Sequence, residues 1–303
     1  MVSIGLFRRV AFLTAFFAYL QIALGGVVRV TGSGLGCPDW PLCHGRPYPA
    51  ADIHSIIEYS HRTVGVITGI LLIATVALAW VVFRNQRPLL AWLATASLIA
   101  IAAEGALGGV VVANELAPWL VVVHLGLAMI ILGFLLATAV MALPATAGVQ
   151  GRSLRRLAGI AAAATYGLML TGSTVVASSA DEGCHAWPLC GNGFALSFTG
   201  ADAFSMLHRG SVLLIGALLV YVLIAALGEV SLRPIAIPTI IVLALQVAVG
   251  AGAALTESAL FNGLHVAIAT LVWAGMLSIA LMTLPRADRE RSMSRLAVEK
   301  RPA

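Results

Sequence analysis

The chain has 303 residues, of which 60% are hydrophobic and 10% are charged, and its mean hydropathy is +0.98. Soluble domains carry about 25% charged residues, so this composition excludes an ordinary soluble protein and predicts one whose solvent is lipid. The net charge of +5 is no indication of nucleic-acid binding, because the basic residues fall mainly in the connections between apolar segments and indicate membrane orientation.

Eight apolar segments follow one another along the chain, each near the length of about 20 residues that a helix needs to cross a bilayer. They cover residues 9–30, 59–83, 88–112, 118–142, 154–178, 204–228, 234–255 and 259–284. The first segment could be a signal peptide, but it is longer than the usual apolar region of one, and its counterpart 154–178 is internal. The sequence therefore predicts an all-α integral membrane protein with eight transmembrane helices.

The basic residues are divided unequally between the two ends of these segments. Only four lie on the side opposite the N-terminus: Arg29, Arg46, Arg62 and Arg209. The other fourteen lie on the N-terminal side: Arg8, Arg9, Arg84, Arg87, Arg152, Arg155, Arg156, Arg233, Arg286, Arg289, Arg291, Arg295, Lys300 and Arg301. Because basic residues accumulate in the cytoplasm, we expect a multi-pass plasma-membrane protein with both termini cytoplasmic.

The second half of the chain repeats the first. Three residues recur at a shift of 147, with Cys37, Cys43 and His61 matched by Cys184, Cys190 and His208. His124 recurs as His265 at a shift of 141, and Glu104 aligns with Gln246 at a shift of 142. An even number of spans keeps both copies in one orientation. We expect two pseudo-symmetric four-helix bundles at 1–143 and 154–285, a cytoplasmic linker at 144–153 and a cytoplasmic tail at 286–303.

Four histidines lie near the outer ends of the second, fourth, sixth and eighth segments. A membrane-embedded imidazole is costly and usually functional, and two facing imidazoles are axial ligands that an iron porphyrin uses. The sequence thus predicts two haem sites, one at His61 and His124 and one at His208 and His265. The alternative is that each histidine only bonds a neighbouring helix. Glycines on the same helices would leave room for a ring or serve plain helix packing: Gly65, Gly69, Gly126, Gly210, Gly216 and Gly263.

The first histidine of each half has a different neighbour three residues earlier. Glu58 shares a helix face with His61, whereas its counterpart beside His208 is Ser205. Glu58 is therefore the candidate catalytic carboxylate, able to relay protons or stabilise a cationic intermediate; alternatively it flanks a helix start.

An arginine follows the first histidine of each half. Arg62 and Arg209 are candidate contacts of haem propionates, or they extend along the helix to the interface. Either role places both arginines at the outer ends of their helices.

Both cysteine pairs fall in the outer loops, 31–58 and 179–203. Thiols there meet an oxidising compartment, so we expect disulfides within Cys37/Cys43 and Cys184/Cys190. A redox-active thiol pair and a metal site are alternatives, although the spacing is a poor match to zinc sites. The remaining loop histidines are predicted to be surface residues: His44, His54 and His185.

In this order, the eight segments, the Glu58–His61–Arg62 motif, the other three histidines and the loop cysteines resemble bacterial haem A synthase, in particular its cysteine-containing subgroup of Gram-positive type. The resemblance covers roughly residues 9–284. It implies that the C8 methyl of haem O is oxidised to a formyl group, giving haem A for terminal oxidases. It also implies haem O as substrate at His61 and His124, haem b as cofactor at His208 and His265, and an essential Glu58. Haem O synthase and an electron donor are the implied partners, and Cys37/Cys43 the pair tied to activity.

Two other functions fit part of the pattern. A bis-histidine dihaem b-type cytochrome would only carry electrons, and it would give Glu58 no task. A transporter would also contain internal repeats, but its polar groups would lie near the midplane rather than at the outer ends.

Overall fold

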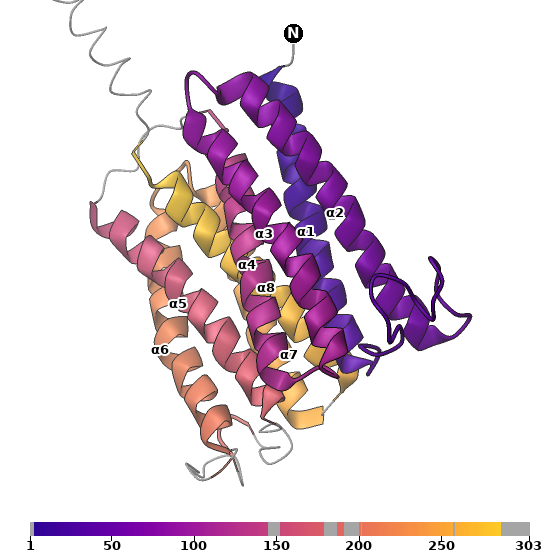
Figure 1. The fold of residues 1–303 in the computed structure, drawn as a ribbon. Coiled ribbons are helices and arrows are strands. Elements are labelled where there is room, and N and C mark those ends of the chain that lie inside the picture. The colour runs from indigo at the N-terminus through magenta and orange to yellow at the C-terminus, as the bar shows by residue number, and fades with distance from the viewer. Residues whose placement is uncertain are drawn as a thin grey trace, which may run out of the picture.

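The computed structural model describes residues 3–144, 152–178, 187–190, 200, 202–256 and 258–285. Within these residues the chain forms eight α-helices (Figure 1). They are α1 (Ile4–Val30), α2 (Ile53–Phe83), α3 (Pro88–Ala113), α4 (Pro118–Met141), α5 (Arg152–Ala177), α6 (Asp202–Leu227), α7 (Arg233–Thr256) and α8 (Ala259–Met282).

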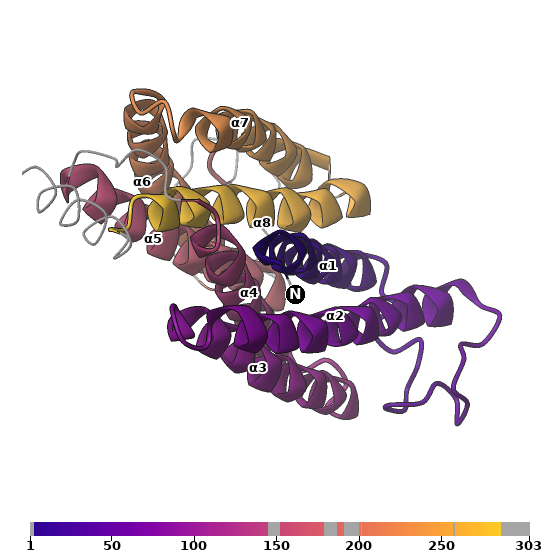
Figure 2. The ribbon, with the colours of Figure 1, turned by 90° about the horizontal axis from the view of Figure 1, so that it is seen from above.

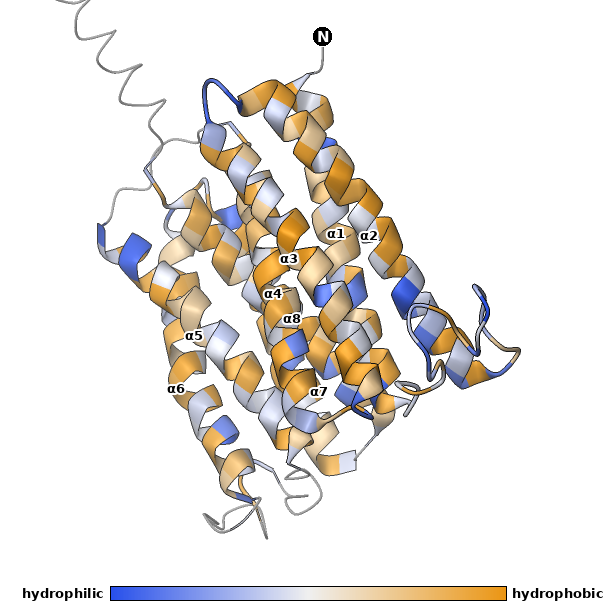
Figure 3. Ribbon diagram, viewed as in Figure 1, coloured by the Kyte–Doolittle hydropathy of each residue, from blue (hydrophilic) through white to orange (hydrophobic). Residues whose placement is uncertain are grey.

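All eight helices are long and apolar enough to cross a membrane, and hydrophobic residues dominate their middle stretches (Figure 3). The predicted all-α, eight-span fold class is therefore confirmed. Pro88 and Pro118 stand at the first positions of α3 and α4, where the missing N–H of proline costs nothing.

Helix α2 is longer than the sequence predicted. Its apolar stretch begins at residue 59, yet the helix starts at Ile53, because the carboxylate of Asp52 caps it by accepting a hydrogen bond of 2.9 Å from the Ser55 N–H. At about 1.5 Å per residue, 31 residues reach about 46 Å, beyond the roughly 30 Å of a hydrocarbon core. The outer end of α2 therefore extends past the lipid toward the loop.

The helices pack with the same set of neighbours in each half. Within α1–α4 and within α5–α8, the first helix packs on the second and fourth, and the third packs on the second and fourth. Contacts between the halves join α1 to α8, α4 to α5, and α4 to α8. Of these helices, α1, α4 and α8 lie at the centre of the view in Figure 2. The pseudo-symmetry and the division at 144–153 stay predictions; residues 145–151 and the tail 286–303 lie outside the described residues.

Trp273 of α8 joins the two halves. Its indole N–H donates a hydrogen bond of 3.1 Å to the Ala162 carbonyl of α5. The far edge of its ring lies against Gly133 of α4, where a Cβ would come within 3.0 Å. Tyr166 of α5 donates a hydrogen bond of 3.2 Å to the Gly126 carbonyl of α4. These contacts hold α4, α5 and α8 together in one core.

Candidate functional site

The structure brings together the histidines that the sequence paired. His61 and His124 lie on α2 and α4, and His208 and His265 lie on α6 and α8. In each half these two helices are diagonal to each other, because both pack on the first and third helices of that half. Each half therefore holds two imidazoles from two different helices, an arrangement that fits a haem with two axial histidines.

Each imidazole lies against a glycine of the preceding helix. A Cβ built on that glycine would come within 2.9–3.4 Å of the histidine Cε1. The pairs are Gly25 with His61, Gly108 with His124, Gly172 with His208, and Gly250 with His265. Only glycine leaves full space for the ring at the tighter of these distances. The six glycines singled out from the sequence lie on the histidine helices themselves, and none of them has a histidine as its neighbour.

A polar side chain of the same preceding helix also faces each imidazole, at 2.9–3.1 Å. The pairs are Gln21 with His61, Glu104 with His124, Thr171 with His208, and Gln246 with His265. Glu104 is the single carboxylate among these four. Gln21 and Thr171 were not predicted to be histidine partners. Each is a polar side chain in an otherwise apolar span, and that feature could have indicated them.

The combination of one glycine and one polar residue around each histidine is called an imidazole seat below. These seats contain all the buried side-chain nitrogen and oxygen atoms without a hydrogen-bond partner in the described part of the chain. Four of them are Gln21 Oε1, His61 Nδ1, Glu104 Oε2 and Gln246 Oε1. The other two, Glu104 Oε1 and His124 Nδ1, lie 3.0 Å from each other at ion-pair distance but without hydrogen-bond geometry. Buried polar atoms are nearly always paired in proteins, and the exceptions here gather at the predicted ligands. The seats therefore fit a bound group that takes imidazole nitrogen.

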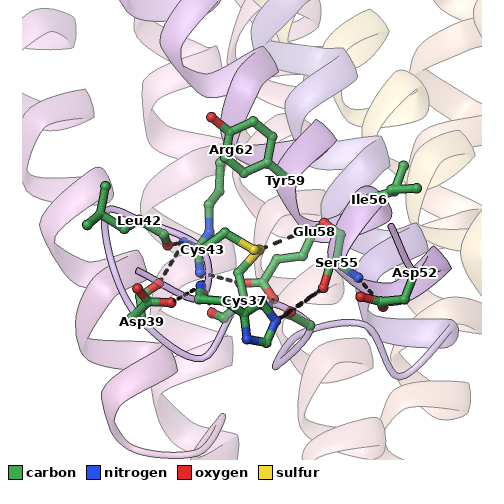
Figure 4. Close-up of a disulfide and its surroundings, with 12 residues drawn as sticks. Cys37, Asp39, Leu42, Cys43, Asp52, Ser55, Ile56, Glu58, Tyr59 and Arg62 are labelled. Atoms are coloured by element: carbon green, nitrogen blue, oxygen red, sulfur yellow. Dashed lines mark hydrogen bonds and ion pairs between the residues drawn. A yellow bond between two sulfur atoms is a disulfide. The ribbon is translucent and has the colours of Figure 1, made fainter. Parts of the chain in front are cut away.

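A disulfide loop lies at the outer end of α2 (Figure 4). Cys37 and Cys43 form the predicted disulfide, and both are buried. Cys190 is also disulfide-bonded, whereas Cys184 and His185 lie outside the described residues. The Asp39 carboxylate accepts hydrogen bonds of 2.6 and 2.7 Å from the His44 and Gly45 N–H groups. The bond from Gly45 is the main cause that holds the pKa of Asp39 below its ordinary value.

The loop is bound to α2 by Arg62 and Glu58. The Arg62 guanidinium donates to the carbonyls of Asp39, Leu42 and Cys37 at 2.7–2.8 Å and to the Glu58 carboxylate at 2.5 Å. The other Glu58 oxygen accepts a hydrogen bond of 2.7 Å from the Cys37 N–H. The carboxylate, 5% exposed, therefore points to the loop rather than to His61, and the Arg62 terminal nitrogens already have protein acceptors.

The Cys37–Cys43 loop packs closely on α2 and α3. A Cβ on Gly36 would come within 2.5 Å of the His54 backbone, and the Gly36 carbonyl accepts a hydrogen bond of 2.6 Å from Ser55. The Trp40 indole lies over Gly109 of α3, where a Cβ would be 3.0 Å away. The sequence analysis predicted His54 to lie in a loop, but in the structure it belongs to the first turn of α2.

In the second half, Arg209 takes a position comparable to that of Arg62. Its guanidinium donates a hydrogen bond of 3.4 Å to the Pro188 carbonyl, close to Cys190 in the chain. Its predicted contact with a propionate, like that of Arg62, stays a prediction.

Comparison with known proteins places the whole arrangement in context. The COX15-CtaA family model, described as a cytochrome oxidase assembly protein, matches residues 8–55 and 51–277. A haem A synthase of Bacillus pumilus is 29% identical over 222 residues, covering 69% of this chain and 71% of that protein. Haem A synthases of Exiguobacterium sibiricum and Bacillus cereus are each 28% identical, covering 75% and 80% of this chain and 77% and 81% of those proteins.

Proposed function

The chain belongs to the COX15-CtaA family of cytochrome oxidase assembly proteins, and on that basis we propose that it is a haem A synthase. The reaction is oxidation of the C8 methyl of haem O to a formyl group, which makes the protein an oxidoreductase of haem A biosynthesis. The relatives named haem A synthase cover most of this chain and most of their own length.

The observation that carries this proposal is the set of four imidazole seats, two in each half. The unpaired buried Nδ1 of His61 and the glycines that make room for each ring support ligation of a porphyrin iron. We assign His61 and His124 to the haem O substrate. We assign His208 and His265 to haem b, which when bound supplies one-electron transfer.

The two halves differ in a way that supports this division of labour. Glu58 stands at the outer end of the histidine helix α2 and binds the Cys37 N–H of the disulfide loop, whereas the matching position of the second half is Ser205. Buried carboxylates bound by an arginine and a backbone N–H are expensive to assemble without a role. We propose two roles for the Glu58 carboxylate. It accepts a proton at the outer end of α2, and it keeps the disulfide loop closed over the outer end of the N-terminal half, so that water is excluded there.

The remaining assignments follow from the same proposal. The protein lies in the plasma membrane with both termini cytoplasmic, because its basic residues cluster on that side. Haem O synthase supplies the substrate, and an electron donor completes the reaction. Nucleic acid is not a partner.

Pigment extraction after expression of the chain together with a haem O supply tests the function. The expected result is haem A in the wild-type extract and none from His61→Ala or His124→Ala, while haem b remains in both variants. Haem B alone in the wild type, at both sites and with haem O available, would instead identify a dihaem cytochrome that only carries electrons. A control is Gln86→Ala, which removes an exposed side chain in the α2–α3 turn and should leave haem A formation intact.

A further inference from the structure

Three of the four imidazole seats have the same spacing of four residues, because Gln21 and Gly25 of α1 share it with the seats of α3 and α7. The seats of α3 and α7 differ in one functional group. In α3, Glu104 Oε1 lies 3.0 Å from His124 Nδ1, and Gly108 stands one turn further along. In α7, Gln246 Nε2 lies 3.0 Å from His265 Nδ1, and Gly250 stands one turn further along. The same spacing of four residues places each polar group and its glycine on one helix face. The first seat therefore offers a carboxyl group where the second offers an amide.

Packing alone does not account for Glu104. Its side chain is 12% exposed, and Oε2 has no hydrogen-bond partner. Oε1 lies 3.0 Å from the ring nitrogen Nδ1 of His124, at ion-pair distance but without hydrogen-bond geometry. Burial of a carboxyl group with so little compensation is costly, and the polar group that it faces is the imidazole of His124.

A carboxylate behind a ligating histidine has a known physical effect. When one ring nitrogen binds iron, the other donates its proton to an outer acceptor, which fixes the tautomer and makes the ring a stronger electron donor. A charged acceptor holds this proton more strongly than a neutral amide does, and the amide of Gln246 turns its Nε2 donor, not its oxygen, toward His265. A stronger donor favours ferric over ferrous iron, so it lowers the potential of the one-electron couple.

Resting on the haem sites proposed above, we propose that Glu104 is a positioning residue of the N-terminal site. It directs His124 Nδ1 toward α3, which leaves Nε2 for the iron, and it holds that iron at a lower reduction potential than the amide of Gln246 allows at His265. The carboxylate–amide difference between these seats thus makes the two sites unequal in potential.

The test exchanges the two groups in the full-length protein loaded at both sites with haem b. Glu104→Gln keeps the shape and an acceptor oxygen but removes the charge, and Gln246→Glu is the reciprocal variant. Midpoint potentials are measured by mediated redox titration with absorbance and electron paramagnetic resonance detection. A His208→Ala background, which leaves only the N-terminal haem, assigns each signal.

We expect Glu104→Gln to raise the N-terminal potential and Gln246→Glu to lower the C-terminal one, each leaving the other haem unchanged. Residues that hydrogen-bond a ligating histidine alter metal binding by about 10–100-fold, and a tenfold change in the ratio of ferric to ferrous binding corresponds to about 59 mV. If Glu104→Gln binds no haem, the reciprocal variant decides: a lowered C-terminal potential supports the proposal and an unchanged one overturns it.

The outcomes separate this inference from the proposed function. Two bound haems whose N-terminal potential is the same in wild type and Glu104→Gln would overturn the role of Glu104 and leave the haem sites standing. A wild-type chain that binds no haem would overturn the sites themselves and the role of Glu104 with them.

Discussion

Glu58 and Arg62 connect the disulfide loop to the helix that carries His61. The carboxylate receives the Cys37 N–H and the guanidinium, and the guanidinium holds three loop carbonyls. A hydrogen bond to a charged group contributes about 1.5–3 kcal/mol, so the loop is held far more firmly than its few apolar contacts would allow. We therefore expect chemistry at the proposed N-terminal haem site to depend on this ion pair.

Replacing Glu58 by Gln should abolish turnover while haem remains bound. The amide can still accept from the Cys37 N–H, but it provides neither the ion pair with Arg62 nor a proton acceptor, and losing a general acid or base costs about 10²–10⁴-fold in rate. The measurement is haem A yield alongside total haem per chain. Glu229→Gln, which removes a carboxylate from the α6–α7 connection, is the control, and an undiminished haem A yield in Glu58→Gln would reject the role.

Replacing Arg62 by Lys should loosen the loop. An ammonium group cannot reach all four acceptors that the planar guanidinium satisfies, and the loss of one charged hydrogen bond, about 1.5–3 kcal/mol, predicts a rise in loop opening of roughly tenfold or more. Reduction of the Cys37–Cys43 disulfide by a membrane-impermeant reductant reports that opening. Arg46→Lys, at an exposed arginine stacked on Tyr48, should leave the reduction rate unchanged.

The loop should also respond to acid. The pKa of Asp39 lies below its ordinary value of 3.8 because the Gly45 and His44 N–H groups bind the carboxylate. A depressed pKa in the folded state stabilises the loop above the unfolded value, and this contribution is lost as pH falls through the lowered pKa. Hydrogen exchange of the loop peptide, corrected for intrinsic rate, should be constant from pH 7 to about 4 and accelerate below it. In Asp39→Asn that acid-dependent acceleration should be absent.

At the scale of the helix, the imidazole seats set the position of each histidine. A Cβ at Gly172 of α5 would come within 3.0 Å of His208 Cε1, whereas one at Gly167 of the same helix would meet no atom within 4 Å. Gly172→Ala should therefore displace the ring and weaken or remove the low-spin absorption of the C-terminal haem. Gly167→Ala should retain it. Equal spectra in the two variants would show that the seats do not control ligation.

The histidines and spans could be predicted because they depend on local pattern. Apolar length identifies a helix, and a repeat identifies paired positions without any knowledge of contacts. The direction of the Glu58 side chain could not be predicted in this way. Helical spacing places Glu58 and His61 on one face, but the Cys37 N–H and the Arg62 guanidinium compete for the carboxylate, and the first of these lies 21 residues away in the chain.

The positions of the glycines beside the histidines could not be predicted from the sequence either. Glycines on the histidine helices were predicted to make room for a ring, but the glycines that lie against the imidazoles, such as Gly25 and Gly250, belong to the preceding helices. Which glycine faces which ring depends on how α1 packs on α2 and α7 on α8, and periodicity does not encode that rotation.

At the scale of the whole molecule, the halves share one core through α4, α5 and α8. Trp273→Ala would open a large cavity at this junction and remove its bond to Ala162; losing a buried aromatic costs about 3–5 kcal/mol. We expect a lower unfolding temperature of the detergent-solubilised protein, and Trp119→Ala, at an exposed tryptophan, should change it little.

Orientation is a second property of the whole chain. Gln86 in the α2–α3 turn lies at the end of the bundle opposite the Cys37–Cys43 loop (Figure 1). A cysteine at Gln86 should react with an impermeant maleimide only in inverted vesicles, and one at Pro47 only in intact cells. The reverse pattern would invert the proposed topology.

The most direct test is the haem content of the purified full-length protein after saturation with haem b. Two low-spin haems per chain are expected, falling to one in His61→Ala and to one in His208→Ala. A chain that stays colourless, or one whose Soret absorption survives replacement of all four histidines by Ala, would contradict the account.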